Sequence, residues 1–206
     1  MKIELPACPI GGQMTDFERK KLFTWVYESE PSTVVEIGGG EGGGSTFYMI
    51  EAMAQLKDSG KSEESVFLSA DPLNGPAQMF FGTNDRYKYF TKFFPLSDHI
   101  KYVFTHPEAP SPDFIFFDGP DDENFNLQEF LHFDNIAKSG CKFVCHDWET
   151  QRRALDGHVC PKVNLLRPYL EQLDTWETIE CLSGVDNVWP NELETKSVGL
   201  IYMQKK

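Results

Sequence analysis

The sequence predicts a doubly wound α/β fold whose seven-stranded sheet is mostly parallel with one antiparallel strand. Short apolar runs rich in β-branched and aromatic residues alternate with segments of helical spacing, an order typical of parallel sheets. The last two apolar runs have only a polar loop between them, so they are expected to form a hairpin that adds the antiparallel strand near the edge. With 206 residues and no repeat, linker or low-complexity segment, residues 1–206 are expected to form one domain.

Each expected strand is a short apolar run that a turn signal ends. Glu36 and Ile37 precede a glycine cluster, Asp71-Pro72 follows the second run, and Gly119-Pro120 stops the run that is most clearly buried. Glycine and proline interrupt regular structure at such positions. The strands are expected at residues 33–37, 65–70, 99–104, 112–118, 141–145, 176–182 and 198–203.

The expected helices are located by their first-turn residues and by apolar spacing. Thr15-Asp16-Phe17-Glu18 has the form of a capping box, and this helix ends before Pro31. Further helices are expected after the glycine cluster as far as residue 58, near residues 85–94, around residues 127–131 as far as Ser139-Gly140, and over residues 163–173. The acidic residues 121–123 are expected to favour a helix N-terminus, with a role as additional metal ligands as the alternative. Pro168 lies inside the last pattern and is expected to kink or restart that helix.

The glycine cluster between the first strand and its helix is the most informative feature of the chain. Gly38, Gly40 and Gly43 satisfy the pattern G-x-G-x-x-G, which opens main-chain N–H groups to a ligand. Glu36 lies two residues before the first glycine, where a carboxylate repels pyrophosphate and suits a ligand with a cationic end. Glu41 acts in the same direction. S-adenosylmethionine (SAM) has an ammonium and a sulfonium but no phosphate, so we interpret the loop as a SAM site first and an NAD site second.

The acidic composition limits the classes of partner. The formal net charge is −13, and nucleic-acid affinity comes largely from Lys and Arg on phosphates, so nucleic acid and anionic membranes are disfavoured. No apolar run approaches the roughly 20 residues that span a bilayer, and the N-terminus lacks the apolar region of a signal peptide. We expect a cytoplasmic protein that acts on a small molecule, and a homodimer is left open.

The five cysteines are odd in number and contain no C-x-x-C pair, which disfavours a disulfide framework and fits a reducing compartment. Cys141, Cys145, His158 and Cys160 are the set that offers a zinc alternative. Cys141 and Cys145 lie on an expected buried strand, where cysteine commonly acts as a small hydrophobic residue. We therefore prefer the structural role.

Four motifs follow one another at the carboxyl ends of expected parallel strands, the edge at which open α/β sheets bind ligands. They are Val35-Glu36-Ile37-Gly38 with Gly43-Gly44-Ser45-Thr46, then Ala70-Asp71-Pro72, then Ile115-Phe116-Phe117-Asp118-Gly119, then Val144-Cys145-His146-Asp147-Trp148. Over about residues 33–203 the chain resembles the class I SAM-dependent methyltransferases, which have a Rossmann-like sheet. It looks most like the small-molecule O-methyltransferases whose fourth and fifth strands end in D-G and H-D.

This resemblance implies a role for each motif. Glu36 and the loop that contains Gly38, Gly40 and Gly43 would hold the methionine portion of SAM, with Ser45 beside them. Asp71 would accept hydrogen bonds from both ribose hydroxyls, although a strand-ending turn is the alternative for Asp71-Pro72. Asp118 would lie where SAM and the methyl acceptor meet.

The resemblance also raises a metal site. Metal-dependent members bind one divalent cation through a carboxylate after strand four and an acidic pair after strand five. Asp118 and Asp147 match these positions and His146 takes the first place of the pair, so the three are expected to bind Mg²⁺ or another divalent cation. Because imidazole suits Mg²⁺ poorly, His146 is alternatively the general base. A capping turn beneath Trp148 is the structural alternative.

The expected activity is transfer of the SAM methyl group to a small acceptor, a hydroxyl first, with assistance from a divalent metal. Residues 106–111 are too few for the helix that many relatives have between strands three and four, so the adenine pocket is expected from Thr105, His106 and Glu108. The alternatives are an NAD-dependent oxidoreductase, for which no hydride-site residue is identified, and a catalytically silent SAM-binding protein.

Overall fold

The fold is that of a computed structural model, which describes residues 5–10, 14–62, 64–148, 161–182 and 199–206. The chain divides into two compact units, residues 1–103 and 104–206. Seven strands form a sheet in the order β3-β2-β1-β4-β5-β7-β6, which confirms the predicted α/β fold class. β7 is antiparallel to both β5 and β6 and is the antiparallel strand that the hairpin prediction required.

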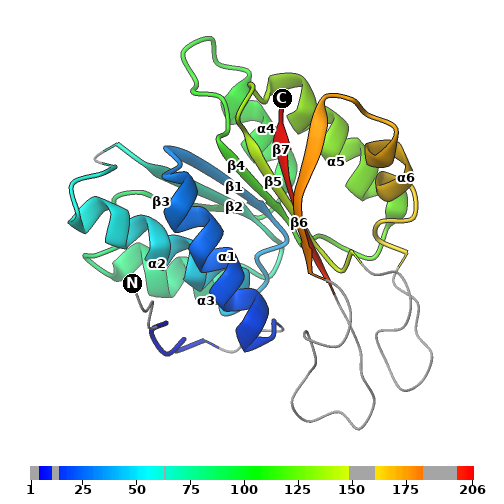
Figure 1. The fold of residues 1–206 in the computed structure, drawn as a ribbon. Helices are drawn as coiled ribbons and strands as arrows, with labels where there is room; N and C mark the ends of the chain where they lie inside the picture. Colours follow the sequence, from blue (N-terminus) through cyan, green and yellow to red (C-terminus); the bar gives the residue numbers. More distant parts are fainter. Residues whose placement is uncertain (1–4, 11–13, 63, 149–160, 183–198) are drawn as a thin grey trace, which may run out of the picture. The chain divides into compact units, whose positions relative to one another are not determined.

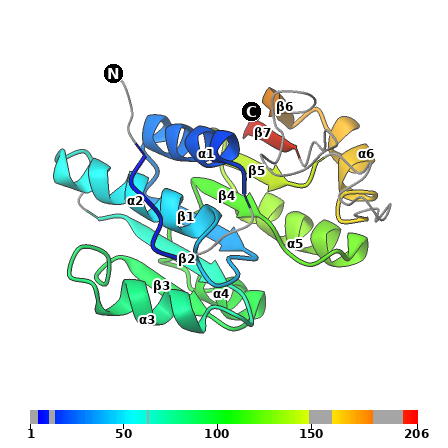
Figure 2. The same cartoon turned by 90° about the horizontal axis from the view of Figure 1, so that it is seen from below.

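The first unit has a parallel β3-β2-β1 arrangement, and Figure 2 shows these three strands side by side. Its elements are α1 (Asp16–Ser29), β1 (Thr33–Ile37), α2 (Ser45–Asp58), β2 (Val66–Ala70), α3 (Gly75–Thr83), β3 (Thr91–Phe94) and α4 (Ser97–Phe104). Thr15 and Glu18 form the predicted capping box at the start of α1. Helices α1 and α2 pack against each other (Figure 1), and Phe81 of α3 packs between Phe47 of α2 and Phe93 of β3.

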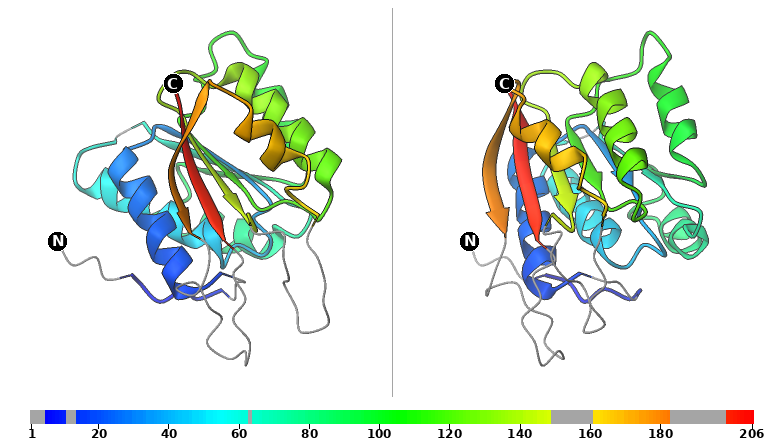
Figure 3. Two further views of the ribbon diagram at one scale, coloured as in Figure 1. Left: turned by 45° about the vertical axis from the view of Figure 1, so that its right-hand side comes forward. Right: turned by 90° about the vertical axis from the view of Figure 1, so that its right-hand side faces the viewer.

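The second unit contains β4 (Phe114–Phe117), α5 (Glu123–Ile136), β5 (Lys142–His146), α6 (Leu166–Glu171), β6 (Trp176–Leu182) and β7 (Leu200–Lys205). Figure 3 shows β6 in orange beside β7 in red, as their pairing requires. Phe143 of β5 lies at the centre of an aromatic core and contacts Phe117, Phe130 and Trp176. Such ring pairs add to the free energy of burial.

The helix ends in this unit follow local sequence signals. Asp122 caps α5 by accepting hydrogen bonds from the backbone N–H groups of Asn124 and Phe125, which is the role expected for the acidic residues 121–123. The helix ends at Ile136, a few residues before the expected Ser139-Gly140. α6 begins at Leu166, so Pro168 falls in its first turn, where a proline does not break the helix.

The prediction for residues 85–104 is wrong. Residues 91–94 form β3 and residues 97–104 form α4, where a helix near 85–94 and a strand over 99–104 were expected. Thr91 and Phe93 suit a strand and pair with Phe67 and Ser69 of β2. Asp98 lies in the first turn of α4, where an acidic residue is stabilised by the helix dipole.

This correction also removes the argument for the adenine pocket. Because α4 lies between β3 and β4, the helix that was expected to be missing is present. Thr105, His106 and Glu108 follow α4 and are exposed. Their assignment to the adenine pocket therefore loses the reason on which it depended.

Two further expectations concern a membrane span and a zinc site. Within the described residues, no helix is both long and apolar enough to cross a membrane. Cys141 and Cys145 are buried, and burial raises the pKa of the Cys141 thiol to about 12, which fits the role of a small hydrophobic residue. His158 and Cys160, the other members of the zinc alternative, lie outside the described residues.

Candidate functional site

The glycine loop leaves β1 through backbone conformations that favour glycine. Gly38 has φ 92° and Gly40 has φ 53°, in the left-handed region that side chains with a Cβ rarely adopt. The N–H of Gly38 donates to the carbonyl of Ala70 at 2.9 Å, which fixes the start of the loop to the end of β2. A Cβ on Gly40 would meet nothing within 4 Å, so the loop presents open backbone at this position.

Two glycines that the sequence reasoning did not select are needed for packing. A Cβ on Gly39 would lie 2.5 Å from Ser69 Oγ and 2.6 Å from Glu36 Oε2. A Cβ on Gly42 would lie 2.5 Å from the Cβ of Ala77 in α3, and Gly42 also has φ 94°. The spacing G-x-G-x-x-G points to Gly38, Gly40 and Gly43, whereas the close approaches occur at their neighbours.

Glu36 is the centre of a buried group of hydroxyls, which we call the Glu36 cluster and define as Glu36, Ser45, Thr46 and Ser69. The Ser45 hydroxyl donates to Glu36 Oε1 at 2.5 Å. Thr46 and Ser69 donate to Oε2 at 2.8 and 2.7 Å. Glu36 has an exposed fraction of 0%. Its carboxylate therefore joins β1, β2 and the first turn of α2, and so fixes both ends of the glycine loop.

The packing around Gly39 leads to a prediction about stability. Gly39→Ala should lower the free energy of unfolding by about 1–3 kcal/mol, because its methyl group must displace buried oxygens of the Glu36 cluster. Gly82→Ala is the control, since Gly82 lies in α3 with nothing within 4 Å of an added Cβ; it should raise that free energy by about 0.5–1 kcal/mol. Urea denaturation followed by circular dichroism measures both. Equal values for the two variants would contradict the packing argument.

Asp71 follows β2 in the same unit and is partly exposed. Its Oδ1 accepts a hydrogen bond from the Leu73 backbone N–H at 2.7 Å, which is the strand-ending turn considered as its structural alternative. One carboxylate oxygen suffices for that turn, and a carboxylate has several lone pairs. The turn and a ribose contact are therefore compatible.

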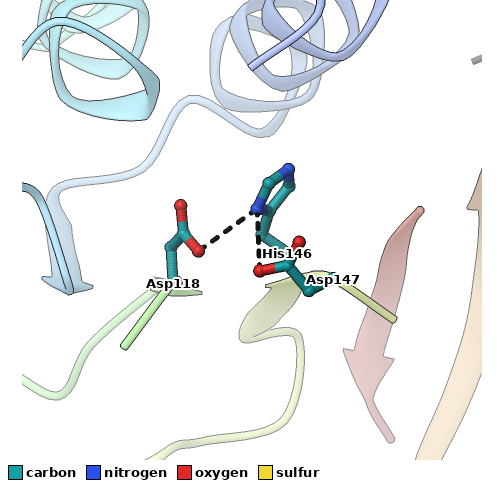
Figure 4. A group of neighbouring side chains, drawn as sticks. All are labelled: Asp118, His146 and Asp147. Carbon is teal, nitrogen blue, oxygen red and sulfur yellow. Dashed lines mark hydrogen bonds and ion pairs between the residues drawn. The ribbon is translucent and has the colours of Figure 1, made fainter. Parts of the chain in front are cut away.

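Asp118, His146 and Asp147 form a second group, which we call the acid cluster. Each offers one ligand atom, and these atoms lie within 4.8 Å of one another. His146 Nδ1 is 3.1 Å from Asp118 Oδ1 and 3.3 Å from Asp147 Oδ2, as the dashed lines in Figure 4 show. The cluster forms because β4 and β5 are parallel neighbours, so the residues that follow them meet at one edge.

Lys162, which lies between β5 and α6, reaches the same two carboxylate oxygens. Its Nζ donates to Asp118 Oδ1 at 2.7 Å and to Asp147 Oδ2 at 2.5 Å. Its side chain is only 2% exposed. Sequence reasoning missed this residue, since its neighbours Val163 and Leu166 mark a buried helix pattern but give no sign that a lysine is buried with them.

The backbone conformation of Asp147 and the charge of Asp118 both fit their place in this cluster. Asp147 has φ 58°, a left-handed conformation that Asp adopts more readily than most residues. Burial alone would raise the pKa of Asp118, but the Lys162 ammonium and the hydrogen bonds from His146 and Lys162 outweigh it and hold that pKa well below its usual range. Asp118 is therefore ionised at neutral pH.

The comparisons with known proteins address the fold. No protein-family model and no curated protein sequence matches the chain. The O-methyltransferase TomG from Streptomyces achromogenes, solved with SAM, is 10% identical with a TM-score of 0.67 and covers 94% of this chain and 82% of its own. An O-methyltransferase from Bacillus cereus, solved with S-adenosylhomocysteine (SAH), is 16% identical with a TM-score of 0.66 and covers 98% and 84%.

A methyltransferase from Podospora anserina, also solved with SAH, is 14% identical with a TM-score of 0.58 and covers 94% of this chain and 80% of its own. The alignments cover at least 80% of each of these three chains. At these identities the likeness shows that the chain shares the fold of these solved structures.

Proposed function

We propose that this protein transfers the methyl group of SAM to a small-molecule acceptor, with a hydroxyl as the acceptor group. The observation that supports this most is the glycine loop, which a buried carboxylate holds at the end of β1, in a fold that solved neighbours use with SAM or SAH bound. A loop backed by a carboxylate disfavours a pyrophosphate, so no observation favours the NAD-dependent alternative.

We assign the cofactor-binding role to residues at the ends of β1 and β2. Gly38, Gly40 and Gly43, of which Gly40 presents open backbone, would contact the methionine portion of SAM together with Ser45 at the start of α2. The Asp71 oxygen that its turn leaves available would accept hydrogen bonds from the ribose hydroxyls. Glu36 acts on this site by holding Ser45 and the loop in place, because its own carboxylate is fully buried.

The acid cluster is assigned to the methyl acceptor. SAM supplies the electrophilic methyl group, and transfer needs the acceptor oxygen in line with it. His146 is the base that takes the acceptor proton, and Asp118 orients His146 through the 3.1 Å contact to Nδ1.

We further propose that the protein is cytoplasmic, which the free cysteines among the described residues support. We also propose that it forms one domain. A homodimer stays a prediction.

The residues of the acid cluster do not fit a resident divalent cation. The donor set of Asp118, His146 and Asp147 has suitable spacing, but the ammonium of Lys162 contacts both carboxylates. A metal ion on these oxygens would have to share them with a neighbouring positive charge. We therefore derive no step of the reaction through a metal.

Calorimetry with SAH and with NAD tests the proposal. SAH should bind and NAD should not. Asp71→Ala should weaken SAH binding by about tenfold to a hundredfold, the value of a hydrogen bond to a charged group. Asp98→Ala is the control, because Asp98 is an exposed carboxylate in α4 that pairs with Lys101. NAD binding without SAH binding would overturn the proposal.

A second measurement separates an active enzyme from a catalytically silent SAM-binding protein. Transfer of a labelled methyl group from SAM should be detected with at least one member of a panel of hydroxylated small molecules. His146→Ala should abolish that transfer while SAH still binds. Binding of SAH with no transfer to any acceptor would support the silent alternative.

A further inference from the structure

The position of Lys162 Nζ is defined by two carboxylates that come from different strands. Asp118 follows β4 and Asp147 follows β5, and Nζ is 2.7 Å from one and 2.5 Å from the other. The contact with Asp118 has the length of a charge-assisted hydrogen bond, and the contact with Asp147 is shorter. A single ammonium thus bridges the ends of two neighbouring strands.

The two contacts compensate the charge of the Lys162 ammonium and the charges of both carboxylates. A lysine that is 2% exposed is costly unless its ammonium is paired and hydrogen-bonded. Two carboxylates held close together likewise need a cation or a proton between them. Lys162 Nζ lies within hydrogen-bond distance of both carboxylates and is the cation that resolves their repulsion.

The same atoms would be the ligands of a divalent ion. Asp118 Oδ1 and Asp147 Oδ2 are the oxygens that face His146 Nδ1, and both are already bonded to Lys162. Mg²⁺ or Ca²⁺ binds such oxygens at about 2.0–2.6 Å. An ion there would lie within about 5 Å of the ammonium, in a buried site where like charges are weakly screened.

We propose that Lys162 is the resident cation of the acid cluster and that this protein needs no divalent metal at that site. Lys162 is a positioning residue: it holds the carboxylates of Asp118 and Asp147 together, and both carboxylates contact His146 Nδ1. This inference deepens the proposed function, but its main readouts are metal content and thermal stability, which do not depend on methyl transfer.

Elemental analysis and thermal melting of the wild-type protein test the proposal first. Protein treated with EDTA should melt at the same temperature with and without millimolar Mn²⁺ or Mg²⁺. Protein purified without chelator should hold far less than one equivalent of divalent metal. One tightly bound equivalent, or a rise of several degrees on adding Mn²⁺ that Asp118→Asn abolishes, would overturn the proposal.

Lys162→Met then creates the site that the lysine prevents. It removes the ammonium, keeps an apolar side chain of similar length, and leaves Asp118, His146 and Asp147 in place. The variant should melt at a lower temperature than wild type, and Mn²⁺ should raise its melting temperature by several degrees. Adding Asp118→Asn and Asp147→Asn should remove that response.

Two further variants complete the test. Lys138→Met, at an exposed lysine in the same unit, should change neither the melting temperature nor the metal response. Lys162→Arg keeps the positive charge and should stay indifferent to Mn²⁺, which decides the question if the methionine variant does not fold. A metal response in Lys162→Arg would contradict the proposal. If the wild-type protein does not bind SAH, the proposed function is overturned, whereas the results on metal content and melting temperature still stand.

Discussion

Replacing Asp118 and Asp147 together by asparagine is expected to lower the free energy of unfolding by about 3–5 kcal/mol. The reason is Lys162, whose ammonium is buried and donates to both carboxylates. Neutral amides leave that ammonium inside the protein without a compensating charge. If the two carboxylates formed an empty metal site with no lysine between them, the same substitutions should raise the free energy of unfolding. Amides would then relieve the repulsion between two bare carboxylates.

Urea denaturation in EDTA measures this effect. Asp174→Asn is the control, since Asp174 is an exposed carboxylate in the same unit and should change the free energy of unfolding by less than about 0.5 kcal/mol. Adding Lys162→Met to the double variant should recover part of the loss, because it removes the unpaired charge. A double variant more stable than wild type would exclude the ammonium as the partner of these carboxylates.

The same pair of proteins gives a test by pH. The folded pKa of Asp118 lies below its unfolded value of about 3.9. Its contribution to stability is therefore fully present above that value and is lost as the pH falls toward the folded pKa. The part of the difference between wild type and the double variant that Asp118 contributes should shrink as the pH falls below about 4.

Most of the fold was predictable because its strands are apolar runs with clear ends. β1 ends at a glycine cluster and β4 at Asp118-Gly119-Pro120, and such signals are local. Residues 97–104 were not predictable in the same way. Ile100, Val103 and Phe104 suit a strand by composition but lie three and four residues apart, as on a helix, and short segments with both properties are ambiguous.

The candidate site was predictable where chain topology brings residues together. Asp118, His146 and Asp147 were expected to meet because parallel strands end at one edge, and they do. Lys162 reaches them from a separate segment, and sequence alone does not distinguish a buried lysine from the many exposed ones. The partners of Glu36 divide similarly: Ser45 is nearby in the chain, whereas Ser69 is placed by the β1–β2 register.

Glu36→Ala is the second change with a large expected effect. The Glu36 carboxylate accepts hydrogen bonds from Ser45, Thr46 and Ser69. Its removal leaves a cavity and takes away the acceptor of Ser45 and Ser69, whereas Thr46 keeps the carbonyl of Gly39; the free energy of unfolding should fall by about 3–5 kcal/mol. Glu36→Gln keeps the volume and one carbonyl oxygen, so it should stay folded and lose about half as much.

The two Glu36 variants also show how this residue affects the cofactor. If Glu36 acts by holding the loop, loss of stability and loss of SAH affinity should increase together from Glu36→Gln to Glu36→Ala, as urea denaturation and calorimetry would measure. Glu28→Ala, at an exposed position of α1, should change neither quantity. A Glu36→Ala protein of wild-type stability that no longer binds SAH would instead mean that the carboxylate contacts the ligand directly, because a group that only supports the loop cannot be removed without cost to the fold.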